Sequence, residues 1–530
     1  MNNSYVITPD SDIYLLKCPL EIDSLHTLDF ASSSAQQTYF QSLPKQLMDD
    51  ATYMRKDGRL YFEGSFDTYV TYNYCMYKNT NYSSKWFYAF VSDIRYENNN
   101  VVSCQLITDV YQTWMFDFTL KKSFVERSHV ATQYDTIGNY TYPEGLETGE
   151  YITYDHHYDP SLVPDCVIVG CTIDTEYNPQ TNMTYFSGCY NGLYSGCGYY
   201  RFDNYSQLTS WLNGNVKLAP DSIVTMFMYP KALAPLATGS NNKVDFSGSP
   251  MNKDYGISRI TTLDGYTPKN KKLLCWPYCY IMLSNGVGTS SIYHQELWAV
   301  DTNTSHSTYG EMVVHADGVL CPGGSIRIYP KNYKKCEYNY DEGFSLGKYP
   351  QLSWQVDLYT NWEVQNGVNF FGTPLTATQA GVLGGGAKLG INLAQGDIVS
   401  GAGNLRQIYD TMQEQYRHNL IPPAIAGNIN SGDVSAITGS MAFQFRRCGI
   451  RAEYAQKIDN YFEMFGYKIN NVIVPNTTSR SKWNYIKTIE CNMTGDIPEN
   501  DLQRLKDLYN GGFTIWHDTT HFMDYTQTNS

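Results

Sequence analysis

The chain has 530 residues, of which 42% are hydrophobic, 17% are charged and 15% are aromatic, with 47 tyrosines. This length accommodates about three to five domains of ordinary size, or two large β domains with additions. Aromatic and β-branched side chains suit pleated surfaces, so the composition predicts a mainly β protein. It excludes a coiled coil, a helical solenoid and a disordered chain. The net charge of −14 disfavours sequence-specific binding to duplex DNA, although a wall that does not hold phosphate would suit DNA passage.

The cysteines indicate a cellular compartment. There are 13 of them at irregular spacing, and residues 1–5 lack the basic and apolar parts of a secretion signal. We therefore expect the chain to fold in a reducing cytoplasm, with most thiols free and buried.

Residues 1–150 form the first predicted domain, an N-terminal β tube domain of short strands and turns. Trp86, Tyr88 and Phe90 alternate with their neighbours at period two, which predicts a strand. The alternation resumes from Val102 to Val110 after the Asn-rich turn at residues 97–100. These two strands should form a hairpin.

Residues 151–371 form a second predicted β region with long loops. The apolar runs at residues 166–171 and 223–229 have strand length, and Gly-rich turns separate such runs.

Residues 372–441 differ sharply in composition, with 12 glycines, two aromatic and seven charged side chains. Such a composition most often indicates a flexible Gly-rich hinge. However, the segment is poor in charge, Ser and Pro, and it carries small residues at the spacing that lets helices approach in lipid. No part of it has 18 continuous apolar residues, so we predict a membrane-active loop insertion that stays shielded until triggered. Its candidate membrane-active residues are Val382, Leu383, Gly384, Gly385, Gly386, Leu389, Ile391, Leu393, Ile398 and Val399.

One stretch of this insertion has helical periodicity and ends before Pro422. We predict an interfacial helix there, although packing as ordinary core is the commoner fate of an amphipathic helix. The residues of its apolar stripe are Leu405, Ile408, Tyr409, Met412 and Tyr416.

Residues 442–530 should pack back on the N-terminal domain. An amphipathic helix from Tyr454 to Phe465 is expected to end at Gly466. A second helix should begin at Pro498 and have Gly511 just past its end.

We find no catalytic signature and predict neither an enzyme, a metal site nor a cofactor. Gly384 to Leu389 resembles a phosphate loop but lacks the hydroxyl residue that would hold magnesium. Cys275 and Cys279 lack a second cysteine pair at zinc-binding spacing, so buried thiols are expected. His517 and His521 have metal-like spacing, but we interpret them as part of a solvated tail.

Several short segments resemble a known family. These are residues 85–91 (KWFYAFV), 109–116 (DVYQTWMF) and 123–130 (SFVERSHV), with 464–468 (MFGYK), 483–488 (WNYIKT) and 511–517 (GGFTIWH) near the other end. They are similar to the tail knob, or distal tail tube, proteins of small short-tailed podophages with protein-primed replication. Matches near both ends suggest that the resemblance covers the whole chain.

The resemblance implies a virion protein at the tail tip, synthesised in the host bacterial cytoplasm. It implies a homohexameric tube of β-barrel or β-sandwich domains, with a few short helices, that contacts other tail and lower collar proteins. It also implies that long hydrophobic loops plug the lumen and later penetrate the host cytoplasmic membrane, so that genomic DNA can pass. By position and composition those loops correspond to residues 372–441. The alternative is an adsorption protein that binds cell-wall glycan, with hydrolase activity as an option, but no carboxylate pair can be nominated for that reaction.

Overall fold

A computed structural model of the chain divides into two compact units. Unit 1 comprises residues 1–147, 268–273 and 453–530, and unit 2 comprises residues 148–267 and 274–452. The structure describes residues 11–51, 58–79, 85–158, 162, 164–171, 189–190, 193–194, 198–211, 223–238, 242–244, 251–286, 288–320, 325–349, 351–352 and 443–530.

The first sheet of unit 1 is antiparallel, with the strand order β3-β1-β5-β6-β7-β4. Its strands are β1 (Ser11–Leu16), β3 (Lys45–Ala51), β4 (Arg59–Glu63), β5 (Tyr74–Asn79), β6 (Phe87–Asn98) and β7 (Val101–Thr108). The pairing of β6 with β7 confirms the predicted hairpin. Both faces of β6 are packed, since Ala89 belongs to one core cluster whereas Tyr88 and Phe90 belong to another.

The predicted second strand of the hairpin does not extend to Val110. Asp109 ends it, because its carboxylate accepts the backbone N–H of Gln112 at 3.1 Å and so caps helix α3 (Val110–Trp114). Val110 therefore lies in the helix.

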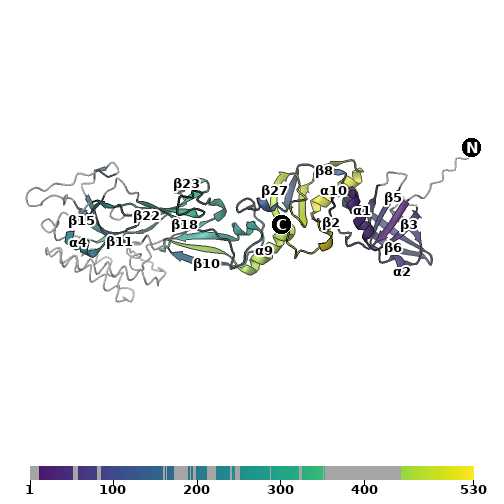
Figure 1. Ribbon diagram of the computed structural model, residues 1–530, viewed down its shortest axis with the longest axis horizontal. Coiled ribbons are helices and arrows are strands. Elements are labelled where there is room, and N and C mark those ends of the chain that lie inside the picture. The colour runs from purple at the N-terminus through teal and green to yellow at the C-terminus, as the bar shows by residue number, and fades with distance from the viewer. Residues whose placement is uncertain are drawn as a thin grey trace, which may run out of the picture. The chain divides into compact units, whose positions relative to one another are not determined.

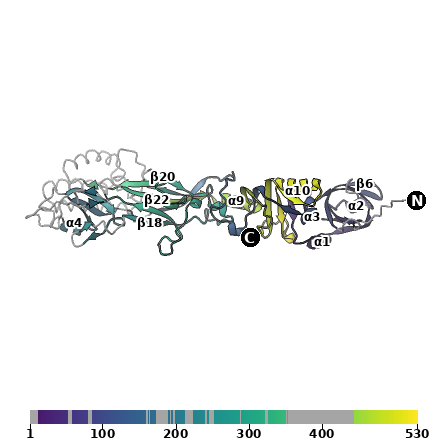
Figure 2. The same cartoon turned by 90° about the horizontal axis from the view of Figure 1, so that it is seen from above.

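The second sheet of unit 1 joins strands from both ends of the chain in the order β2-β30-β28-β9-β27. Figure 1 and Figure 2 show elements from the start of the chain beside yellow-green elements from its end. The strands are β2 (His26–Leu28), β9 (Ser123–Ser128), β27 (Tyr467–Ile473), β28 (Trp483–Glu490) and β30 (Phe513–Trp516), and β8 (Phe118–Leu120) pairs with β29 (Met493–Gly495).

Helices and aromatic side chains join the two sheets of unit 1. Trp483 and Trp516 are fully buried beside Tyr74 and Tyr88 of the first sheet. Burying such large side chains contributes about 1.5–3 kcal/mol each. The helices are α1 (Ser33–Ser42), α2 (Phe66–Tyr69), α9 (Ala452–Phe465) and α10 (Glu499–Gly511), and η1 (Thr132–Tyr134), η6 (Lys271–Leu274) and η8 (Thr519–His521) are short 3-10 turns.

The two predicted C-terminal helices are confirmed. Helix α9 ends at Phe465, and Gly466 follows it with a φ of 63°. Helix α10 was expected to begin at Pro498, which is instead its N-cap, and Gly511 is its last residue rather than the residue past its end. The left-handed position is Gly512, with a φ of 85°.

Unit 2 contains several antiparallel sheets. A four-stranded sheet has the order β10-β26-β19-β20, and a six-stranded sheet has the order β16-β17-β14-β11-β15-β25. Strands β11 and β15 confirm the two predicted apolar strands and pair with each other. The strands of these two sheets are β10 (Tyr151–Tyr158), β26 (Gln444–Ile450), β19 (Cys279–Ser284), β20 (Ser290–Tyr293), β11 (Pro164–Cys171), β14 (Gly198–Phe202), β15 (Ile223–Pro230), β16 (Ala237–Thr238), β17 (Lys243–Val244) and β25 (Gln351–Leu352).

A five-stranded sheet, a short two-stranded sheet and one helix complete the description of unit 2. Their elements are β18 (Asn252–Ile257), β21 (Met312–Asp317), β22 (Ser325–Tyr333), β23 (Cys336–Tyr338), β24 (Phe344–Lys348), β12 (Cys189–Tyr190), β13 (Leu193–Tyr194) and α4 (Tyr205–Trp211), with the 3-10 turn η7 (Gln295–Leu297). The predicted mainly β fold with a few short helices is confirmed. Of the helices that the structure describes, none combines the length and the apolar character needed to cross a bilayer.

Candidate functional site

The residues that we predict to act on the membrane lie outside the described part of the chain. This holds for the loop positions from Val382 to Val399 and for the helical stripe from Leu405 to Tyr416. What the structure does describe are the strands that precede and follow this part of the chain.

Both attachment points lie in unit 2. The last described residue before the segment is Leu352 of β25, which pairs with Met226 of β15. The next described residue is Phe443, which is buried, with its ring centroid 5.2 Å from that of Tyr255. The following strand, β26, pairs with β10 on one side and β19 on the other, so the return point is held by an inner strand of a sheet.

A buried ion cluster ties together three segments of unit 1. The fully buried carboxylate of Glu144 forms salt bridges with Arg127 of β9 and with Lys272 of the crossing segment 268–273. It also accepts the backbone N–H of Lys468 at 2.9 Å. Burying the carboxylate of Glu144 costs free energy, because the charge loses its contact with water. The two ion pairs and the hydrogen bond offset this cost.

The crossing segment is also held by helix α9. The carboxylate of Asp459 accepts the backbone N–H groups of Lys269 at 2.7 Å and Asn270 at 3.1 Å. Nearby, the hydroxyl of Tyr467 donates to Asp135 at 2.8 Å, and burial raises the pKa of Tyr467 well above its usual range. Residues 268–273 are thus fixed within unit 1 on both sides.

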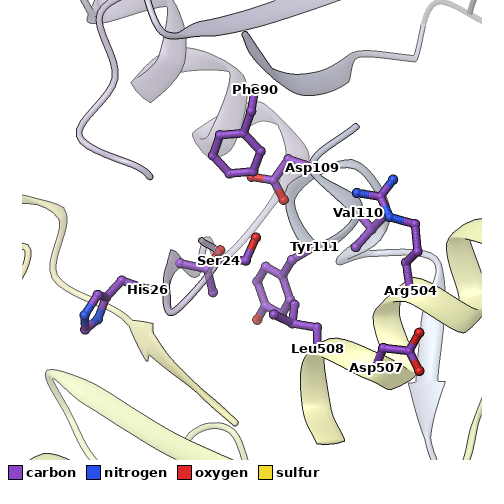
Figure 3. A pocket seen from close by; sticks show the side chains of 10 residues that line it. Ser24, His26, Phe90, Asp109, Val110, Tyr111, Arg504, Asp507 and Leu508 are labelled. Carbon is purple, nitrogen blue, oxygen red and sulfur yellow. The ribbon is translucent and has the colours of Figure 1, made fainter. Parts of the chain in front are cut away.

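A cavity of about 240 Å³ lies where the first sheet of unit 1 meets helices α3 and α10 (Figure 3). Figure 3 shows Asp109 between Phe90 and Tyr111, with Arg504 and Asp507 approaching from α10. Arg504 donates to the backbone carbonyl of Thr108 at 2.9 Å. The cavity therefore joins residues from both ends of the chain.

Asp109 is a buried acidic residue that lines this cavity. Burial raises its pKa to about 6, against the opposing effect of hydrogen bonds from the Gln112 N–H and the Tyr74 hydroxyl. The carboxyl is hydrogen-bonded to Tyr74 of β5 and to Gln112 of α3, so it links the first sheet to that helix.

The remaining candidates from the sequence have structural roles. Cys279 is buried, and the side chain of Gln295 approaches its sulfur at 3.5 Å. Among the described residues there is no group of three or more His, Cys, Asp or Glu side chains placed to hold a metal ion.

Our interpretation of the C-terminal histidines as a solvated tail is wrong for His517. Its imidazole is hydrogen-bonded to Asp29 at 3.1 Å and to Asn484 at 3.0 Å. The residues that follow His517 are also packed on unit 1, because the rings of Phe522 and Tyr525 contact the ring of Trp516.

The ion cluster and the Asp109 cavity could not be anticipated from the sequence. Glu144 and Lys272 are separated by 128 residues, and no local motif links them. The one available signal was at Asp109, which directly precedes a helix and has the type of residue that caps one.

Comparisons with known proteins agree along the whole chain. A family model described as the C-terminal domain of tail knob protein gp9 of Bacillus phage phi29 matches residues 241–530. A second, described as the caudoviral major tail protein N-terminus, matches residues 10–121. The tail knob protein gp9 of Bacillus phage phi29 is 26% identical and that of Bacillus phage B103 is 24% identical, each over 99% of both chains.

A solved structure shares the fold. The tail knob protein gp12 of bacteriophage C1 matches with a TM-score of 0.66 and 17% identity, covering 97% of this chain and 98% of that one. Because the gp9 model alone spans more than half of the residues, the chain belongs to the family of phage tail knob proteins represented by gp9 of phi29.

Proposed function

We propose that six copies of this protein form the distal tail tube, and that residues 372–441 of each copy plug it until they are released into the host cytoplasmic membrane. Membership of the tail knob family makes the protein a structural component of the phage virion, in contact with other tail proteins. We assign it no catalytic step, and genomic DNA passes through the tube without sequence-specific binding.

The observation that carries the proposal is the insertion itself. Within a tail knob protein, 70 consecutive residues carry seven charges and 12 glycines, and the described strands that precede and follow them in the chain, β25 and β26, are both paired with other strands. An apolar segment of this length must be shielded in solution, and an assembly provides such shielding. In lipid its backbone groups must be satisfied internally, so the released segments should become helical and associate through their small residues.

The charge of the chain is consistent with a DNA conduit. Six copies at −14 would carry a total of about −84, and a wall of that sign repels phosphate rather than binding it.

Two measurements on the purified protein test this proposal. Electron microscopy of negatively stained particles should show six-fold rings with a central opening, whereas monomers or trimers would contradict it.

The protein should also release dye from liposomes once the segment is exposed. Replacing Val382, Leu383, Leu389, Ile391 and Leu393 with Asp should abolish release while the rings still form.

A matched control keeps the second test specific. Asp at Leu236 and Val319, which are exposed apolar residues of unit 2, adds charge elsewhere and should leave release unchanged. If the variant with all five Asp substitutions releases as much dye as the parent does, the membrane role assigned to the segment is wrong.

A further inference from the structure

The cavity of unit 1 that contains Asp109 has the form of a site for a small ligand. Among the residues that line it, Phe90, Asp109, Val110 and Tyr111 are buried, whereas Arg504 of α10 is exposed. The cavity therefore has a buried wall and an opening to solvent. Its volume of about 240 Å³ lies below the range of about 300–1,000 Å³ that is usual for drug-sized molecules, so a ligand must be smaller than these.

The hydroxyl group of Tyr111 is a buried polar group without a partner in this cavity. Tyr111 is only 5% exposed, and its hydroxyl forms no hydrogen bond with any residue that the structure describes. Its ring is held in place by Phe513, with the two ring centroids 5.5 Å apart. Figure 3 shows the hydroxyl directed away from Asp109 and toward Leu508. A buried hydroxyl without a hydrogen bond costs free energy, which a bound ligand with a polar group would restore.

Two charged side chains of α10 also keep donors and acceptors unused. The guanidinium of Arg504 carries five N–H donors, and its one hydrogen bond within the described part of the chain goes to the carbonyl oxygen of Thr108. One carboxylate oxygen of Asp507 accepts the side-chain amide of Gln503 at 2.9 Å, and the other oxygen has no described partner. Because Arg504 and Asp507 are three residues apart, they lie on the same side of the helix.

These groups fit a ligand that is neutral and rich in hydroxyl groups. A guanidinium only donates hydrogen bonds and a carboxylate only accepts them, whereas an alcohol hydroxyl does both. An anion would be repelled by the carboxylate of Asp507, and a cation by the guanidinium of Arg504. Phe90 and Leu508 also line the cavity and offer apolar surface to the carbon atoms of a ring.

We propose that this cavity binds a single sugar ring, either as a free monosaccharide or as the end residue of a glycan. The inference goes beyond the proposed function, since neither a tube nor a membrane segment requires a ligand in unit 1. An amino acid also combines donors with acceptors. However, its ammonium and carboxylate groups would both have to lose water, which costs more free energy than the desolvation of neutral hydroxyls.

Saturation-transfer NMR with the full-length protein tests the binding directly. The probes are glucose, N-acetylglucosamine, the trimer of N-acetylglucosamine, and glycine as a zwitterion of similar polarity. We expect transfer from the protein to at least one of the three sugars and none to glycine. Transfer to a monosaccharide would identify the single ring as sufficient, whereas transfer to the trimer alone would identify the end of a glycan as the source.

Two variants locate the bound sugar in the cavity. Tyr111→Phe removes the unpartnered hydroxyl and keeps the ring, so it should weaken sugar binding about ten-fold while the midpoint of thermal unfolding does not fall. Arg504→Gln removes the guanidinium and should weaken binding by a similar factor. Tyr61→Phe is the matched control, because Tyr61 is exposed on β4 and does not line the cavity. It should leave the affinity unchanged.

Three results would overturn the inference. The first is the absence of transfer to all three sugars. The second is an affinity that neither Tyr111→Phe nor Arg504→Gln changes, which would place the sugar elsewhere on the protein. The third is transfer to glycine without transfer to any sugar, which would make the ligand a zwitterion. None of these results bears on ring formation or dye release, so failure of this inference and failure of the proposed function are distinguishable.

Discussion

The carboxyl of Asp109 makes the stability of unit 1 depend on pH. Its folded-state pKa of about 6 lies above the ordinary value of 3.8. The folded protein therefore holds this proton more tightly than the unfolded chain does. The resulting stabilisation is present below about pH 4 and is lost as the pH rises through 6.

Replacing Asp109 with Asn should remove the loss of stability that the parent shows as the pH rises through 6. The amide oxygen of Asn can still accept the N–H of Gln112, so the cap of α3 is kept. Relative to the parent, the variant should gain up to about 3 kcal/mol in unfolding free energy between pH 4 and pH 8. Denaturant unfolding of both proteins at several pH values measures this difference.

The comparison between variants is needed because a second buried group acts in the opposite direction. Burial lowers the pKa of His129 to about 3, so its neutral ring costs stability as the pH falls from 6.5. Asp507→Asn, in the same cavity as Asp109 but exposed, is the control. If it changes the pH dependence as much as Asp109→Asn does, burial of Asp109 is not the cause.

Among the secondary-structure elements, the end of helix α9 depends on one glycine. Gly466 has a φ of 63°, and a Cβ atom there would lie 2.3 Å from the backbone oxygen of Ser128. Gly466→Ala should therefore cost more than about 2 kcal/mol, because it adds a backbone clash to a strained conformation.

Gly511 provides a matched control for that substitution. It is the last residue of α10, and a Cβ atom there would have no neighbour within 4 Å. Gly511→Ala should change the midpoint of thermal unfolding little, whereas Gly466→Ala should lower it clearly. Equal effects at both positions would mean that the contact with Ser128 is relieved by a small shift of the chain.

Local patterns predicted the elements but not their assembly. Alternation at period two located β6 and β7, and apolar runs of strand length located β11 and β15. Apolar residues on one helical face located α9 and α10. Each of these signals lies within one element. Strand order could not be predicted, since β9 is bonded to β27 and β28 more than 330 residues later. The same reason hides the candidate sites: Glu144 and Lys272 are separated by 128 residues, and Trp114, which donates to Asp501 at 2.8 Å, is separated from it by 387.

For the molecule as a whole, the burial of the thiols determines which of them can react. Cys18, Cys75, Cys104, Cys166, Cys279, Cys448 and Cys491 are free and buried, as we expected, and Cys336 is free and exposed. Burial raises the pKa of the Cys18 thiol to about 12, which suppresses the reactive thiolate.

Alkylation of the native protein should therefore modify Cys336 much faster than these seven buried thiols. Peptide mapping measures the rates, and Cys336→Ser should remove the fast label at that site. Mass analysis of intact virions without reductant should find no disulfide among these eight residues. Two or more stoichiometric disulfides would contradict folding in a reducing compartment.

Deletion of the insertion tests whether the two units fold without it. Strands β25 and β26 precede and follow the segment in the chain, and each is hydrogen-bonded to partners outside the segment. Replacing residues 372–441 with a short Gly/Ser linker should therefore keep both units folded, because closing a long loop costs little more than closing a shorter one. Far-UV circular dichroism and negative-stain images should show a folded protein that still forms six-fold rings. The same preparation should have lost dye release from liposomes, whereas the parent retains it. If the deleted protein is insoluble or unfolded, residues 372–441 are part of the core, and their interpretation as a releasable loop is wrong.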